Sequence, residues 1–226
     1  MEGQEDKVRR LDPSKLTYPE WVRFFFDRPI REKVFWDEIA QYDEYREISE
    51  PTRLIHHLQT LCVEHRAIRA AYSEEQVDQG LWAIFATFRH HEVLFDIAID
   101  LEMRIKCIES MYHVFFDVVA NMEGDVVGTF YWMWWDYMGQ EHCGYSQLPV
   151  HRVDRQQTLN AIVRTLAKVL DLPHRGCQWS ALHGLGHCNH HPKALEIVQQ
   201  YLDVHGAQLS DEDRQWVEAC RECRVV

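Results

Sequence analysis

The sequence contains few of the residues that form tight turns, which argues against an all-β fold. Its 226 residues include 10 Gly and 7 Pro, fewer than a protein with many β-turns requires. No useful length of the chain alternates apolar and polar residues as a half-buried strand does. Apolar residues instead recur at helical spacing along almost the whole chain. We therefore predict an all-α fold.

The chain also lacks long apolar runs. None approaches the roughly 20 residues that span a bilayer, and the charged segment 1–10 does not resemble a secretory signal. The seven cysteines are an odd number without the spacing of a disulfide framework, as expected for reduced thiols. We expect a cytoplasmic protein with no membrane partner.

Basic residues are outnumbered by acidic ones, 24 to 36, which gives a formal net charge of −12. Proteins that bind nucleic acids neutralise phosphates with clustered Lys and Arg, and the chain has no dense basic run. We therefore expect no nucleic-acid partner. Two interpretations of the negative charge stay open: simple solubility, or attraction to a basic protein partner.

Familiar catalytic signatures are missing too. The chain has no G-x-S-x-G elbow and no phosphate-binding P-loop. The segment Gly184-Leu-Gly186 is followed by His187-Cys188-Asn189, so the third glycine of a dinucleotide-binding motif is absent. We assign no catalytic residue and no cofactor.

Helix-start signals divide the chain into segments. Thr17 to Glu20 and Ser73 to Gln76 form capping boxes, and Pro51 suits a first helical turn. The remaining expectations are a helix at about 31–42, a long interrupted helix at about 92–122, a loose connection at 139–150, and helices opened by Asp154 and Ser210.

Segment 177–202 is the most informative part of the chain, and it predicts two short helices joined at Pro192. Leu182 and Leu185 belong to the apolar stripe of the first helix. Gly184 and Gly186 lie at the margins of this stripe, which indicates either the close approach of a neighbouring helix or a local break in the helix. In the second helix one face collects Ala194, Leu195, Ile197, Val198, Tyr201 and Leu202.

The pattern Ala181-Leu182-x-x-Leu185-Gly186, a polar turn, Pro192-x-Ala194-Leu195, then Val198 and Leu202 resembles a short bacterial HEAT-type repeat over about 175–204. It departs from that pattern by placing His191, not Asp, before the proline. The resemblance implies an α-solenoid-like stack of helix pairs with a binding role, and it carries no catalytic residues. Since no tandem period is visible before residue 150, we expect one domain, 1–226, built as an irregular stack of antiparallel helices.

Histidines crowd the first of these two helices. His183, His187 and His190 follow one another at i, i+4 and i+7, opposite the apolar stripe and beside Trp179. We interpret these four residues as a candidate surface for a protein partner. Two histidines at i, i+4 can also share a zinc ion, with thiolates available from Cys177, Cys188, Cys220 and Cys223. No acid or third ligand lies close in sequence on the same face, so we assign no metal ligand.

The aromatic run 130–137 is the second unusual feature. As a helix it would be apolar nearly all round, which predicts burial on several sides. The alternative is that Trp134, Trp135 or Tyr137 reaches the surface, since Trp and Tyr are enriched in binding hot spots. Asp136 carries the only charge in the run, and if buried it requires a partner such as an Arg.

Together these patterns favour a non-enzymatic helical protein that binds another protein, for example by neutralising or scaffolding a basic partner. The alternative is a zinc-binding helical protein, or a metal-dependent hydrolase, centred on the histidine cluster of helix 177–190.

Overall fold

The computed structural model describes residues 12–30, 48–124, 128–139, 152–188, 191–222 and Arg224. Every regular element in these ranges is a helix and none is a strand, so the predicted all-α class is confirmed. The helix predicted at 31–42 and nearly all of the connection predicted at 139–150 lie outside the described residues.

The helices of the N-terminal half begin where the local signals predict. The capping boxes at Thr17 and Ser73 are both formed, and Pro51 occupies a first turn. The elements are η1 (Pro13–Lys15), α1 (Tyr18–Phe26), α3 (Pro51–Val63), α4 (His65–Ala71), α5 (Glu74–Trp82), the π-helix η3 (Ala83–Thr87) and η4 (His90–Leu94).

The long helix predicted at about 92–122 is shorter and starts later. Helix α6 spans Leu101–His113, because the side chain of Asp100 caps it by accepting from the backbone N–H groups of Glu102 and Met103. It continues as the π-helix η5 (Val114–Val118) and the short η6 (Val119–Asn121).

The C-terminal half holds the remaining helices. The aromatic run is divided by a turn at Trp134 and Trp135 into two short helices, and the two helices joined at Pro192 are confirmed. The elements are α7 (Thr129–Met133), α8 (Asp136–Gly139), α9 (Arg152–Leu170), α10 (Arg175–His187), α11 (Pro192–His205), η7 (Gly206–Gln208) and α12 (Asp211–Arg221).

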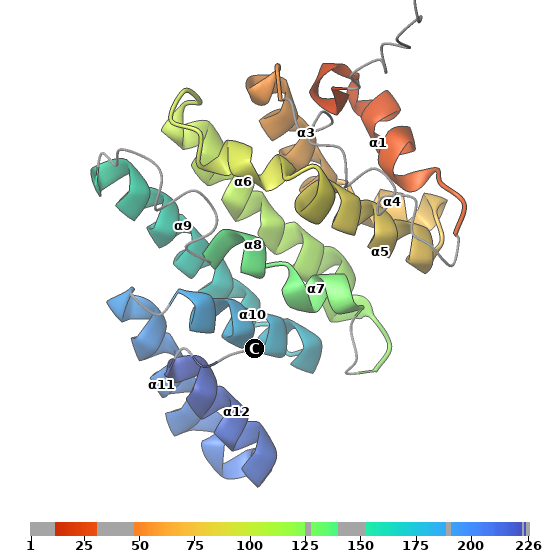
Figure 1. The fold of residues 1–226 in the computed structure, drawn as a ribbon. Coiled ribbons are helices and arrows are strands. Elements are labelled where there is room, and N and C mark those ends of the chain that lie inside the picture. The colour runs from red at the N-terminus through yellow and green to blue at the C-terminus, as the bar shows by residue number, and fades with distance from the viewer. Residues whose placement is uncertain are drawn as a thin grey trace, which may run out of the picture.

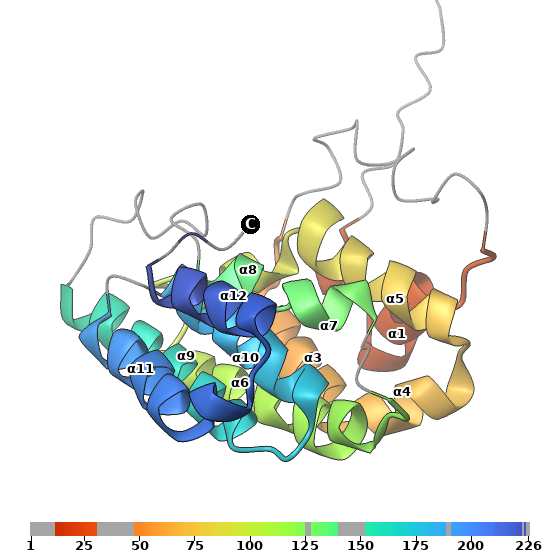
Figure 2. The ribbon, with the colours of Figure 1, turned by 90° about the horizontal axis from the view of Figure 1, so that it is seen from below.

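The helices extend across the molecule from α1 at one end to α11 and α12 at the other, with α6 between them (Figure 1). Helix α6 packs between α3 and α9, and α9 packs on α10. The view from below shows α12 lying over α10, with α7 and α8 on the same side (Figure 2). This arrangement makes α10 an interior helix.

One continuous apolar core runs through the described helices, from Trp21 in α1 to Cys220 in α12. The prediction that the aromatic run supplies core is confirmed: Phe130, Trp134 and Trp135 are fully buried. Within the described chain, no helix combines the length and apolar character needed to cross a membrane.

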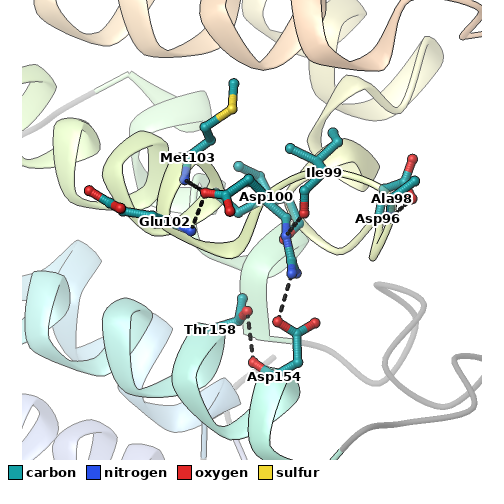
Figure 3. A network of polar contacts seen from close by, with 10 residues as sticks. Asp96, Ala98, Ile99, Asp100, Glu102, Met103, Asp154 and Thr158 are labelled. Carbon is teal, nitrogen blue, oxygen red and sulfur yellow. Dashed lines mark hydrogen bonds and ion pairs between the residues drawn. The ribbon is translucent and has the colours of Figure 1, made fainter.

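A buried ion pair ties α6 to α9 (Figure 3). The Arg104 side chain is only 3% exposed, and its Nη2 lies 2.6 Å from Asp154 Oδ1. Arg104 Nε also donates to the backbone oxygen of Ile99 at 3.1 Å. Asp154, predicted to cap α9, lies instead inside the first turn of the helix, where it supplies the counter-charge for Arg104.

Candidate metal centre

Helix α10 presents two histidines on one face. His183 and His187 are one helical turn apart, so their imidazoles point to the same side. Because α7, α8, α9, α11 and α12 all pack on α10, the histidine face is covered. The His183 side chain is 1% exposed and that of His187 is 15% exposed.

The third member of the site comes from another helix. Asp136 opens α8, and its Oδ1 lies 2.7 Å from His183 Nε2 and 3.3 Å from His187 Nε2. The two Nε2 atoms are 3.1 Å apart. These residues form a group whose candidate ligand atoms all lie within 4.8 Å of one another. We call Asp136, His183 and His187 the His-His-Asp centre.

Close packing at a glycine brings Asp136 to the histidines. Gly184 lies next to His183, and a Cβ atom built on it would be 2.6 Å from Trp135 Cβ and 2.7 Å from Leu166 Cδ2. The absence of a side chain thus lets the segment before Asp136 approach α10 directly, which is one of the two arrangements that the sequence indicated for this glycine. Ser180 Oγ adds a second tie by donating to the backbone oxygen of Tyr131 at 2.7 Å.

The three polar contacts of the His-His-Asp centre cannot all be hydrogen bonds at once. A neutral imidazole nitrogen carries either one hydrogen or one lone pair. If both Nε2–H groups donate to Asp136 Oδ1, the 3.1 Å contact between the two nitrogens contains no hydrogen bond. If either nitrogen is left unprotonated, its lone pair faces the carboxylate oxygen. A cation between them would be attracted to all three atoms.

The spacing of the three atoms suits such a cation. Zinc binds His nitrogen at about 2.0–2.1 Å and carboxylate oxygen at about 2.0–2.2 Å. From the separations of 2.7, 3.1 and 3.3 Å, a point about 2.05 Å from all three atoms lies about 1 Å outside their plane. The three side chains could therefore hold a transition-metal ion and leave further coordination positions to other ligands.

The carboxyl group is in the form that a metal requires. Burial raises the pKa of Asp136, but hydrogen bonds from His183 and His187 outweigh burial and bring this pKa below its ordinary value. Asp136 is therefore ionised at neutral pH. Its partners include two histidines, where the sequence suggested an Arg.

Among the described residues, the cysteines considered as ligands do not join the His-His-Asp centre. Burial raises the pKa values of Cys177 and Cys220 to about 12, so both are neutral thiols at neutral pH. Cys188 is fully buried. Cys223 lies outside the described residues.

The four residues predicted as a partner surface have different surroundings. Trp179 is partly exposed and stacks on Trp216 of α12, with ring centroids 5.4 Å apart. His187 is partly exposed. His183 is buried, so it cannot itself belong to an exposed surface, because α7, α8 and α12 cover that side of α10. His190 lies outside the described residues.

Sequence reasoning missed Asp136 because it searched for a third ligand near the histidines. Asp136 lies 47 positions before His183. The available signal was a single carboxylate within an otherwise apolar aromatic run, since a buried charge requires a partner. That signal predicted a partner for Asp136 without identifying which one.

Comparison of the chain with protein-family models, with curated proteins and with solved structures finds no match. The resemblance of segment 175–204 to a HEAT-type repeat therefore stays a prediction.

Proposed function

We propose that this protein is a zinc-binding helical protein whose metal ligands are Asp136, His183 and His187. The observation that carries the proposal is the convergence of one carboxylate oxygen and two imidazole nitrogens, from α8 and α10, at separations of 2.7–3.3 Å. Imidazole and carboxylate ligands suit zinc, and two histidines with one carboxylate form a known type of zinc ligand set.

Metal analysis of the purified full-length chain tests this proposal. The protein is expressed without a histidine tag, dialysed against metal-free buffer and analysed for several transition metals together. We expect about one zinc ion per chain. Asp136→Asn and His187→Gln preserve side-chain volume while removing a ligand, and each should greatly lower zinc retention, because two remaining ligands hold zinc weakly.

His113→Gln provides a matched control. His113 also pairs with a carboxylate, since its Nδ1 lies 3.0 Å from Asp117 Oδ2 one turn along the helix. This pair is solvent-exposed and is not part of the His-His-Asp centre. The control variant should retain zinc like the wild type. A wild-type chain that emerges metal-free and does not bind added zinc would refute the proposal, and stoichiometric iron in place of zinc would correct the identity of the ion.

Protein binding is a second candidate function. The observation that favours it is the partly exposed pair Trp179 and Trp216, with the guanidinium of Arg175 4.7 Å from the Trp179 ring. Trp and Arg are enriched among residues that dominate binding energy in interfaces. Trp179→Ala should weaken capture of a native partner from cell extract without loss of zinc. If the variant and the wild type capture the partner equally, Trp179 is not part of a protein-binding surface.

A further inference from the structure

A row of aromatic rings leads away from the His-His-Asp centre. The ring centroid of Trp132, in α7, lies 5.0 Å from that of His183 and 5.2 Å from that of Trp216. Trp216 in turn stacks on Trp179. All three tryptophans are partly exposed, so the row gives the surface beside the candidate metal ligands an apolar, aromatic edge.

The number of protein ligands bears on what the centre does. Structural zinc sites are closed by four protein ligands, whereas catalytic sites have three and keep a position for water or substrate. The described residues supply three ligands to the His-His-Asp centre. Solvent reaches it at Asp136 and His187, whose side chains are 11% and 15% exposed.

The net charge of the whole chain and the aromatic rings beside the centre favour an uncharged substrate. The chain carries a formal net charge of −12, which repels phosphate esters and other anions. The ring that packs on His183 is the indole of Trp132, and indole edges favour apolar and aromatic groups. A neutral carbonyl compound with a ring near the scissile bond therefore matches this environment better than a phosphate ester does.

We propose that the His-His-Asp centre hydrolyses neutral carboxylic esters whose acyl group carries an aromatic ring, and that this ring packs against Trp132 and Trp216. The inference rests on the proposed zinc site. A zinc ion held by Asp136, His183 and His187 would lower the pKa of water in the centre. In the hydrolysis the water oxygen bonds to the acyl carbon, and the water gives up a proton to solvent. The bond between that carbon and the ester oxygen breaks, and the departing alkoxide takes a proton from solvent.

The test uses the zinc-loaded full-length chain and three substrates: 4-nitrophenyl phenylacetate, 4-nitrophenyl acetate and bis(4-nitrophenyl) phosphate. We expect zinc-dependent hydrolysis of both carboxylic esters, with a higher kcat/KM for the phenylacetate, and little hydrolysis of the phosphate. Loss of zinc in His187→Gln should lower the rate by about a hundredfold or more.

Two substitutions of Trp132 separate a substrate contact from a structural role. Trp132→Leu should lower kcat/KM for the phenylacetate by about three- to tenfold more than kcat/KM for the acetate. Trp132→Phe keeps an aromatic ring at this position, so it should retain most of the preference for the phenylacetate over the acetate. Phe116→Leu is the control, because Phe116 is an exposed ring that stacks on Tyr112, and it should change neither rate. Zinc content is measured for every variant.

The possible outcomes test the hydrolase inference and the proposed zinc site separately. A chain that holds one zinc ion but hydrolyses neither ester faster than the metal-free protein overturns the hydrolase inference and leaves the zinc site standing. Faster hydrolysis of the phosphate diester overturns the assigned substrate class. An equal loss of both ester activities in Trp132→Leu, at full zinc content, overturns the contact between Trp132 and the acyl ring. A chain that binds no zinc refutes the proposed function itself.

Discussion

Gly184 is the residue on which the geometry of the centre most directly depends. A Cβ atom at this position would lie 2.6 Å from Trp135 Cβ and 2.7 Å from Leu166 Cδ2, far inside van der Waals contact. Helix propensity favours Ala over Gly by about 1 kcal/mol, but the gain is opposed by overpacking, which costs about 1–3 kcal/mol. The close approach of α8 and α9 to α10 outweighs the propensity term.

Gly184→Ala is therefore expected to destabilise the chain by up to about 2 kcal/mol, the overpacking cost less the gain in helix propensity, as measured by urea unfolding. It should also weaken zinc binding, because the displaced Trp135 precedes Asp136. Gly206→Ala is the control, since a Cβ atom there would approach nothing closer than Arg214 Nη1 at 4.0 Å. We expect little change in the free energy of unfolding of Gly206→Ala. If Gly184→Ala and Gly206→Ala are equally stable, the close packing around Gly184 does not limit the size of the residue there.

At the scale of the elements, the contact between α6 and α9 depends on an ion pair as well as on apolar packing. Arg104 is almost fully buried, while the Asp154 side chain is 22% exposed. Removing the carboxylate leaves a buried guanidinium without this counter-charge, and such losses are more costly than the loss of a surface pair. The stability of the contact between α6 and α9 therefore depends on the charge of Asp154.

We predict that Asp154→Asn lowers the free energy of unfolding by about 1–3 kcal/mol. Glu102→Gln serves for comparison, because it breaks an exposed pair with Lys106 on the same helix, and its cost should stay within about 0.5 kcal/mol. Denaturant unfolding of both variants at one pH provides the measurement. A comparable cost for the two substitutions would show that burial does not strengthen the Arg104 pair.

At the scale of the whole molecule, several histidines are enclosed in the core. His65, His90 and His91 are all buried, and His90 and His91 are neighbours in the sequence. Helix η4 packs against α3 and α6, and this covers both His90 and His91. Burial lowers the pKa of each of these three histidines to about 3.

This burial predicts a loss of stability in mild acid. The unfolded histidines bind protons below about pH 6.5, whereas the folded ones stay neutral down to about pH 3. The unfolded state therefore binds more protons in this window, so the free energy of unfolding should be greatest above pH 6.5 and fall as the pH falls. Each histidine contributes at most about 1.4 kcal/mol per pH unit.

Urea unfolding of the metal-free chain from pH 7.5 to pH 4.5 measures this dependence. His65→Gln removes one of the three groups and keeps a side chain able to hydrogen-bond to Tyr131, which lies 2.8 Å from His65 Nε2. The pH slope of this variant should be smaller than that of the wild type. An unchanged slope would mean that His65 does not stay neutral in the folded chain.

The helical class, the capping boxes at Thr17 and Ser73, and the helix pair joined at Pro192 were all predictable from the sequence alone. These features depend on side chains within a few positions of one another, so local patterns suffice to predict them. The sequence also indicated a close approach at Gly184 and burial of the aromatic run, because both follow from the size and polarity of the residues themselves.

The exposure of each side of α10 and the contacts of Asp136 depend on how the helices pack in three dimensions. The histidine face looked exposed in sequence because it lies opposite an apolar stripe, yet packing of α7, α8 and α12 covers it. Asp136 and His183 are separated by 47 positions, and no local pattern encodes a contact at that distance. The two side chains meet because α8 docks on α10 at Gly184, and that docking depends on the packing of the whole chain.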